Sequence, residues 1–173
     1  MKFQIRLARE TDLPDYTKFL QKTYQETYIN ARLGLTSACF SETVFNAPGT
    51  QKYLLSNLQV NSNQKAWVVH IGVRLIGSVS IIEREDDYEL RGFYVATDYQ
   101  NKGIGKELWR RVLKFVKGKD ITCDVYFHNT KTIEMYKKWG FEIDKGKKEF
   151  YRHWLEWPEQ VKAKSIYMRY KLV

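Results

Sequence analysis

The amino-acid sequence predicts an α/β fold of the α+β type, in which a mixed β-sheet is covered by helices. Several segments of the first half have the patterns of strands, and two segments of the second half have the periodicity of amphipathic helices. Each of those helical segments is preceded and followed by an expected strand. A chain that starts with strands and continues as β-α-β-α-β forms a mixed sheet with helices packed against it.

The first half is expected to contain strands and two helical regions. A cap-like Thr-Asp pair and Pro14 begin a helix that ends near Tyr24. A less regular helical region covers residues 41–58 and breaks near residues 46–49, where proline and glycine occur. Polar residues 61–64 form the next loop. The expected strands of this half are residues 3–8, 66–71, 75–82 and 88–95.

The second half is expected to contain two helices with strands between and after them. From Ile104 onward the apolar residues fall on one helical face and basic residues on the other. Asn129 opens the second helix, which ends near Trp139. Residues 145–164 are polar and aromatic and have no element assigned. The expected strands of this half are residues 121–127, 140–143 and 165–172.

Two glycines stand where the strand at residues 88–95 leads into the first of these helices. Gly103 and Gly105 flank Ile104. A helix start has unpaired backbone N–H groups and a partial positive charge, so it attracts anions. Glycine lets a large anionic group approach the backbone because no Cβ stands in the way. The segment is therefore predicted to hold a phosphate or a pyrophosphate.

Two common phosphate-binding motifs do not fit this segment. The dinucleotide fingerprint needs a third glycine three positions after Gly105, where Leu108 stands. The nucleotide-triphosphate loop needs four residues between its glycines, whereas one residue separates Gly103 from Gly105. That loop also needs Ser or Thr after its lysine, and here Glu107 follows Lys106.

The remaining pattern resembles a family motif. The run Gln100-x-x-Gly103-x-Gly105 on a strand, turn and helix resembles the pyrophosphate loop of the GNAT superfamily, the acetyl-CoA-dependent N-acetyltransferases. The second expected helix is similar to the second signature of that superfamily, with Asn129, then Tyr136, then a Gly-Phe pair. Residues 165–172 resemble its last strand. The three features follow one another in the order that the superfamily has.

The resemblance implies a single N-acetyltransferase (GNAT) domain over residues 1–173. Its sheet would be mixed and mostly antiparallel, with about seven strands flanked by helices and a splayed central parallel pair at residues 88–95 and 121–127. Two positions depart from the pattern. Asn101 stands where the superfamily often has glycine, which is tolerable if the position needs no positive φ. Gly92, where a bulky residue is common, marks either a bulge or a locally weakened strand.

The resemblance also implies that acetyl-CoA is the co-substrate. Backbone N–H groups of residues 102–106 would bind its pyrophosphate, and residues 93–95 would pair with the amides of its pantetheine arm. The N–H of Val95 is the candidate for polarising the thioester carbonyl. Asn129 would cap its helix and contact pantetheine, while Lys138 would touch the 3′-phosphate or pair with a nearby glutamate. The expected cofactor-binding residues are Phe93, Tyr94, Val95, Gln100, Asn101, Lys102, Gly103, Ile104, Gly105, Lys106, Asn129 and Lys138.

Transfer of an acetyl group to an amine also needs a base and an acid. A lysine-like amine with a pKa of ~10.4 is mostly protonated at pH 7, so a group or a water path must remove its proton. The resemblance makes Glu89 the candidate base, with ordered water as the alternative. It makes Tyr136 the acid that protonates the coenzyme A thiolate, the alternative being a core aromatic residue.

The predicted activity is direct transfer of an acetyl group from acetyl-CoA to a primary amine, without a metal. The acidic residues among 83–87, together with Glu89, favour a cationic acceptor such as a polyamine, an aminoglycoside or a protein amino group. Two alternatives remain: a transferase for a longer acyl group, and a non-catalytic coenzyme A sensor. Three locations are compatible with residues 23–28, Tyr151, Trp154 and Trp157: the wall of the acceptor pocket, a homodimer interface, or the core.

Composition limits the other classes of function. No run approaches the roughly 20 apolar residues that span a bilayer, and the N-terminus lacks the apolar core of a signal peptide, so a cytoplasmic protein is expected. Cys39 and Cys123 cannot form a disulfide framework or a zinc site by themselves. The net charge of +9 comes without a zinc-finger, helix-turn-helix or RNA-binding pattern, so neither nucleic acid nor a membrane is an expected partner.

Overall fold

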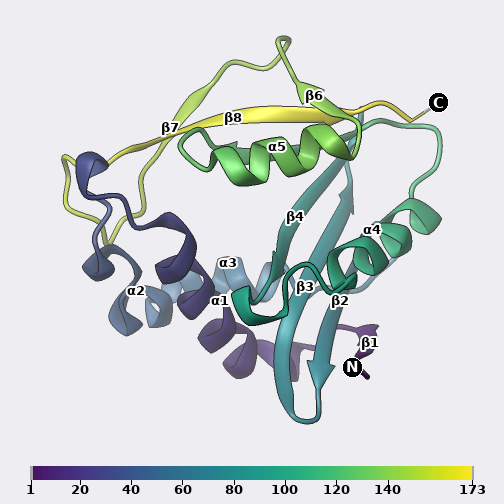
Figure 1. Cartoon of the computed structure of the whole chain (residues 1–173), viewed down its shortest axis with the longest axis horizontal. Coiled ribbons are helices and arrows are strands. Elements are labelled where there is room, and N and C mark those ends of the chain that lie inside the picture. The colour runs from purple at the N-terminus through teal and green to yellow at the C-terminus, as the bar shows by residue number, and fades with distance from the viewer. Residues whose placement is uncertain (1, 173) are drawn as a thin grey trace.

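The computed structural model describes residues 2–172 and contains an eight-stranded mixed sheet (Figure 1). Its strand order is β1-β2-β3-β4-β5-β8-β6, and β7 pairs with β8 beyond that path. The strands are β1 (Gln4–Leu7), β2 (Gln64–Ile71), β3 (Arg74–Glu83), β4 (Tyr88–Val95), β5 (Ile121–Tyr126), β6 (Phe141–Ile143), β7 (Phe150–Arg152) and β8 (Ala163–Tyr170). The helices are α1 (Leu13–Tyr28), α2 (Glu42–Asn46), α3 (Pro48–Ser56), α4 (Ile104–Phe115) and α5 (Thr130–Lys138).

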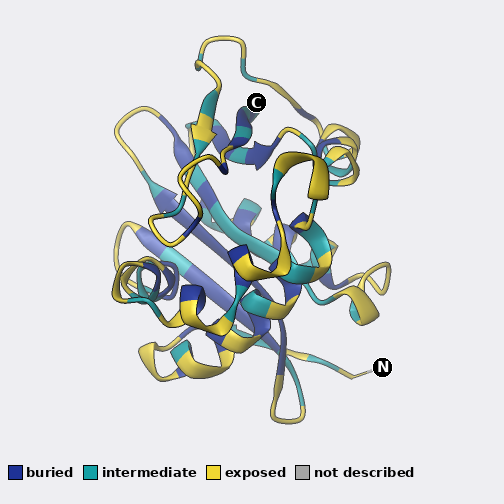
Figure 2. Ribbon diagram, turned by 90° about the vertical axis from the view of Figure 1, so that its left-hand side faces the viewer, coloured by how far each residue is buried: buried dark blue, intermediate teal, exposed yellow. Residues whose placement is uncertain are grey.

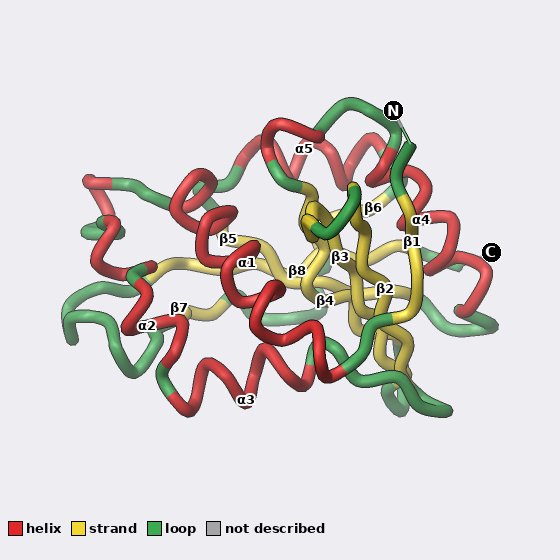
Figure 3. Tube along the Cα trace, turned by 90° about the horizontal axis from the view of Figure 1, so that it is seen from below, coloured by secondary structure: helices red, strands yellow, loops and turns green. Residues whose placement is uncertain are grey.

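Helices cover both faces of the sheet, as Figure 3 shows, and this creates two hydrophobic cores. The first core lies on the side of α1, α2 and α3 and includes Tyr16 and Phe45. The second lies on the side of α4 and α5 and includes Leu108 and Val112, which belong to the predicted apolar face of α4. Figure 2 shows buried strands at the centre and exposed residues on the outer faces of the helices. The predicted mixed sheet covered by helices is confirmed.

The central parallel pair is splayed, as predicted. Between β4 and β5 the parallel register contains only Tyr88 opposite Ile121 and Glu89 opposite Thr122. The rest of β4 pairs with β3 alone, and the rest of β5 pairs with β8 alone. The facing edges of the two strands are therefore left without a neighbouring strand over most of their length.

Gly92 forms a bulge in β4, which selects one of the two predicted alternatives. The register between β3 and β4 shifts between Ser78 and Ser80, and Gly92 has a φ of +54°. An ideal Cβ at Gly92 would lie 2.7 Å from the hydroxyl oxygen of Tyr16. Glycine is required here because a side chain would be strained in this backbone conformation and would clash with that hydroxyl.

Element boundaries differ from the prediction in places where tertiary contacts decide them. Helix α1 continues to Tyr28 rather than ending near Tyr24, because the last turn buries Tyr28 in the first core. Strand β2 starts at Gln64, a residue that the sequence places in a loop; its buried side chain donates to the Ser56 carbonyl. Strand β7 lies inside residues 145–164, where no element was expected, and exists because β8 offers a free edge.

Candidate active site

The loop before α4 contains two residues in the left-handed region. Gly103, the N-cap of α4, has a φ of +84°, and Asn101 has a φ of +59°. Position 101 does need a positive φ, so the condition under which the departure from glycine was tolerable is not met. Asparagine is nevertheless suited to this position, because it enters the left-handed region more readily than other residues that have a side chain.

The turn leaves a row of backbone donors without acceptors. The N–H of Glu107 closes the first turn of α4 on the Gly103 carbonyl at 3.1 Å. Among the described residues, the N–H groups of residues 101–106 have no protein hydrogen-bond partner. Since Gly103 and Gly105 carry no Cβ, a large anion can approach these donors. The geometry is that of an anion-binding helix start.

A cavity of about 730 Å³ connects this turn with the gap between β4 and β5. Its lining includes residues 90–95 on one side and residues 123–126 on the other. Of the predicted cofactor-binding residues, the cavity brings together Phe93, Tyr94, Val95, Gln100, Asn101, Gly103, Gly105, Lys106 and Asn129. The buried side chain of Ile104 packs in the second core.

The end of β4 presents its backbone to the gap. The N–H of Ala96 donates to the Ile76 carbonyl of β3 at 2.8 Å. Since consecutive residues of a strand direct their backbone groups to opposite edges, the N–H and carbonyl of Val95 face the gap. The Gln100 side chain donates to that carbonyl at 3.0 Å. Gln100 therefore fixes the end of the strand, a role beyond the predicted contact with the cofactor.

Two of the three predicted lysines, Lys102 and Lys138, lie outside this cavity. Lys102 donates to the Asp98 carbonyl at 2.8 Å and lies over the Tyr99 ring. Lys138 lines a neighbouring cavity with Asn101 and Lys131. The pairing of Lys138 with Glu134 is not observed, because Glu134 binds Lys137 at 2.9 Å instead.

Tyr136 lies on α5 and lines the cavity opposite β4. Its side chain is buried in the second core and its ring centroid is 6.5 Å from that of Phe93. Burial raises the pKa of Tyr136 well above its ordinary value, and Cys123 and Asp124 add to the effect. The phenol is therefore protonated over the whole physiological range. Asn129 caps α5, as expected, by accepting from the Thr132 N–H at 3.3 Å.

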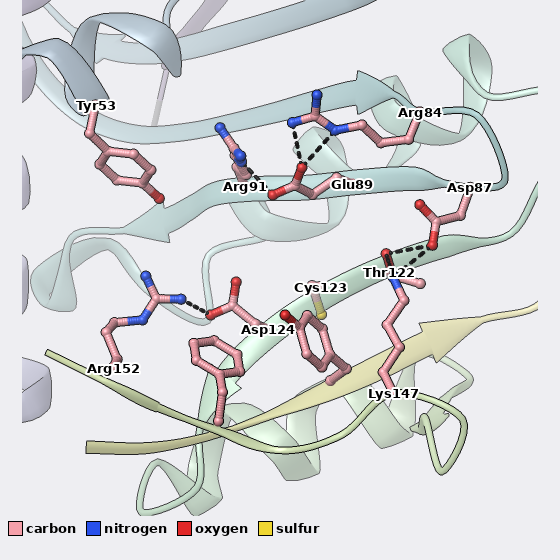
Figure 4. Close-up of a pocket in the computed structure, with 12 residues that line it drawn as sticks. Tyr53, Arg84, Asp87, Glu89, Arg91, Thr122, Cys123, Asp124, Lys147 and Arg152 are labelled. Atoms are coloured by element: carbon pink, nitrogen blue, oxygen red, sulfur yellow. Dashed lines mark hydrogen bonds and ion pairs between the residues drawn. The ribbon is translucent and has the colours of Figure 1, made fainter. Parts of the chain in front are cut away.

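Glu89 lies in a second cavity, of about 360 Å³, which Figure 4 shows. Its carboxylate oxygens accept hydrogen bonds from two guanidinium groups: Oε1 from Arg91 at 2.5 Å and Oε2 from Arg84 at 2.6 and 2.9 Å. Both oxygens are thus engaged. Glu89 and Tyr136 line different cavities.

Asp124 was not predicted as a site residue, yet it lines both cavities. Its Oδ2 accepts from Nη2 of Arg152 on β7 at 2.5 Å. Burial is the largest influence and lowers the pKa of Arg152, but the charge of Asp124 together with the neighbouring tyrosines raises it more, so the net pKa is raised. The sequence signal for Asp124 was a lone carboxylate inside the otherwise apolar and uncharged strand at residues 121–127. Its partner was hidden because β7 was not predicted.

The acids expected to attract a cationic acceptor are largely neutralised. Glu83 pairs with Lys119, and Asp87 accepts from Lys147 at 2.9 Å. The sequence left the location of several aromatic residues undecided. Of these, Trp157 lies in the first core and Tyr151 is exposed. Residues 23, 24, 27 and 28 line the larger cavity. The hydroxyls of Tyr24 and Tyr28 lie 3.0 and 3.1 Å from that of Tyr94 on β4.

Within residues 2–172, no helix is both long enough and apolar enough to cross a bilayer. The same residues contain no group of three or more histidine, cysteine or acidic side chains placed to hold a metal ion.

Comparison with known proteins identifies the family. The model of the Acetyltransferase (GNAT) family matches residues 20–141, and the chain therefore belongs to this family. The uncharacterized protein YrkN of Bacillus subtilis is 30% identical over 116 residues, which are 64% of this chain and 56% of YrkN. The chain thus spans just over half of the length of that relative.

Solved structures show the same fold. The PaiA N-acetyltransferase of Thermoplasma acidophilum, in complex with coenzyme A, has a TM-score of 0.74 at 21% identity, over 99% of this chain and 100% of that one. The ribosomal-protein-S18-alanine N-acetyltransferase of Escherichia coli has a TM-score of 0.61 at 15% identity, over 98% of this chain and 93% of that one. The predicted superfamily and fold are confirmed.

Proposed function

We propose that this protein transfers an acetyl group from acetyl-CoA directly to a primary amine. The observation that carries the proposal is the row of unpaired N–H groups at residues 101–106, which opens onto the same cavity as Tyr136. One end of that cavity suits a diphosphate, and the other end offers a phenol for a departing thiolate. Membership of the GNAT family supports the same chemistry, as does the neighbouring fold solved with coenzyme A.

The side chains and backbone of the cavity divide the chemical work. When bound, acetyl-CoA supplies the activated acetyl group. The Val95 N–H donates to the carbonyl oxygen as negative charge develops there during attack by the amine nitrogen. Tyr136 gives its proton to the sulfur as the carbon–sulfur bond breaks, and its raised pKa keeps that proton available at neutral pH.

Two carboxylates compete for the role of base. Glu89 is the candidate from the sequence, but Arg84 and Arg91 bind both of its oxygens. Asp124 lines the cavity that contains Tyr136, and its Oδ1 has no hydrogen-bond partner among the described residues. We therefore propose that Asp124, directly or through an ordered water, takes the proton of the amine, and that Glu89 orients the arginines.

The test is release of free thiol from acetyl-CoA in the presence of a panel of amines. Asp124→Asn should lower kcat/KM by roughly 10²–10⁴-fold at pH 7, the range of general acid–base catalysis, and by less at higher pH, where more of the amine is already neutral. Glu89→Gln should cost less than about tenfold by the same measure. The reverse order of the two losses would return the role of base to Glu89.

The same assay separates the alternatives to acetyl transfer. Coenzyme A binding without thiol release for any amine would favour the sensor. Faster turnover with a longer acyl-CoA than with acetyl-CoA would favour the broader acyltransferase.

A further inference from the structure

The second cavity continues the larger cavity on the side away from the α4 turn. Five residues line both cavities: Tyr53, Arg91, Cys123, Asp124 and Arg152. Because they line both, these residues mark the passage between the gap that would hold the thioester and the second cavity. An acceptor amine that reaches the gap from this side must pass them.

The second cavity has a surplus of positive charge. Its lining has a net charge of +1, because it contains four basic residues and only three acidic ones. The basic residues are Arg84, Arg91, Lys147 and Arg152, and the acidic residues are Asp87, Glu89 and Asp124. Each of the three acids is already ion-paired. A polyamine would therefore bring several positive charges to a surface whose acids are already paired with arginine or lysine.

Two arginines at the passage keep unused donors. Arg91 donates to Glu89 only through Nε, and Arg152 donates to Asp124 only through Nη2. Among the described residues, the two terminal nitrogens of Arg91, and Nε and Nη1 of Arg152, have no hydrogen-bond partner. The two side chains are only 24% and 27% exposed, so an anion between them would be partly shielded from water. In Figure 4 both guanidinium groups and the Tyr53 hydroxyl lie around the same side of the cavity.

On the basis of the proposed function, we infer that the acceptor is a small molecule carrying both an amine and a carboxylate, of the α-amino acid type. Arg91 and Arg152 would bind its carboxylate, and Asp124 would receive its amine. Asp124 and Arg152 are themselves in contact at 2.5 Å, so the groups that they recognise must also lie close together. One carbon separates the amine from the carboxylate in an α-amino acid, whereas the amine of a lysine side chain has no carboxylate so near.

The experiment compares substrates that differ only in the carboxylate, such as phenylalanine with phenethylamine and alanine with ethylamine. The amino acids should have the higher kcat/KM by roughly 10-fold or more, the effect of hydrogen bonds to a charged group. Arg91→Gln should raise KM for the amino acid and bring its kcat/KM to within about twofold of that of the plain amine. Arg110→Gln, which breaks an exposed ion pair of α4, is the matched control and should leave kcat/KM unchanged for both substrates.

The outcomes distinguish this inference from the function on which it rests. Equal or better turnover of plain amines or polyamines would overturn the inference and leave the acetyltransferase intact. If an aminophosphonate is preferred over the matching amino acid, the group that the arginines bind is a phosphoryl group, and the assignment of a carboxylate is overturned. Coenzyme A binding with no turnover of any amine would overturn the proposed function itself.

Discussion

Replacing Gly105 by alanine should affect folding and cofactor binding in opposite directions. Gly105 is the second residue of α4 and has no positive φ. An added Cβ would meet only the Trp139 ring, at 3.6 and 3.9 Å, which is ordinary van der Waals contact. Alanine is the better helix former, so the free energy of unfolding should stay the same or rise by up to about 1 kcal/mol.

The same methyl group would stand in the binding cavity that Gly105 lines. It would keep a diphosphate from one or two of the N–H donors of residues 101–106. Each such charge-assisted hydrogen bond contributes roughly 1.5–3 kcal/mol. The loss of one of them corresponds to about a 10- to 150-fold weaker affinity for coenzyme A.

Gly49→Ala is a matched control for this experiment. Gly49 is the second residue of α3, has no positive φ, and has open space where a Cβ would stand. Calorimetric titration with coenzyme A should show normal affinity for Gly49→Ala and weakened affinity for Gly105→Ala, while urea unfolding shows neither variant destabilised. Unchanged coenzyme A affinity in a folded Gly105→Ala protein would refute the assignment of the α4 turn as the diphosphate site.

Three further changes test other parts of the structure. Tyr136→Phe should lower kcat by roughly 10²–10⁴-fold while coenzyme A affinity stays within about twofold in calorimetry, and equal losses of both would contradict an acid role. Burial would raise the pKa of Asp12, but hydrogen bonds from Arg6 and from the backbone leave that pKa lowered. The ion pair of Arg6 with Asp12 should therefore stabilise the fold above about pH 4, and this stabilisation should be lost as acid protonates Asp12. In urea titrations Asp12→Asn should therefore flatten the fall in stability between about pH 6 and 3, and a slope equal to that of the wild type would count against the pair. Gly92→Ala should cost roughly 2–5 kcal/mol in unfolding free energy, because of its positive φ and the clash with Tyr16; a cost below about 1 kcal/mol would mean that the bulge tolerates a side chain.

The sequence predicts best the features that depend on neighbouring residues. The apolar face of α4 and the glycines at its start lie within one short stretch, so periodicity and backbone chemistry were sufficient to place them. The bulge at Gly92 was one of two open alternatives, because only the register against β3 distinguishes it from a weakened strand. The splay of β4 and β5 came from family resemblance, since no local pattern encodes a gap.

The features that the sequence did not reveal depend on contacts between distant residues. Asp124 on β5 and Arg152 on β7 meet although the two strands pair with opposite edges of β8, and β7 is too short to show an alternation of its own. The charge of the turn at residues 83–87 was visible, but its partners Lys119 and Lys147 were not. A count of acidic residues therefore overstated the negative charge available to an acceptor.

Because β4 and β5 pair at only two positions, they are held together at one end and separate toward the other. At the separated end, Tyr28 of α1 contacts both strands. The Tyr28 hydroxyl contacts Tyr94 of β4 at 3.1 Å, while its ring packs against Tyr126 of β5 with centroids 4.6 Å apart. The Tyr28 side chain thus links α1 to both strands, so a displacement of α1 would change the distance between β4 and β5 without disrupting either strand.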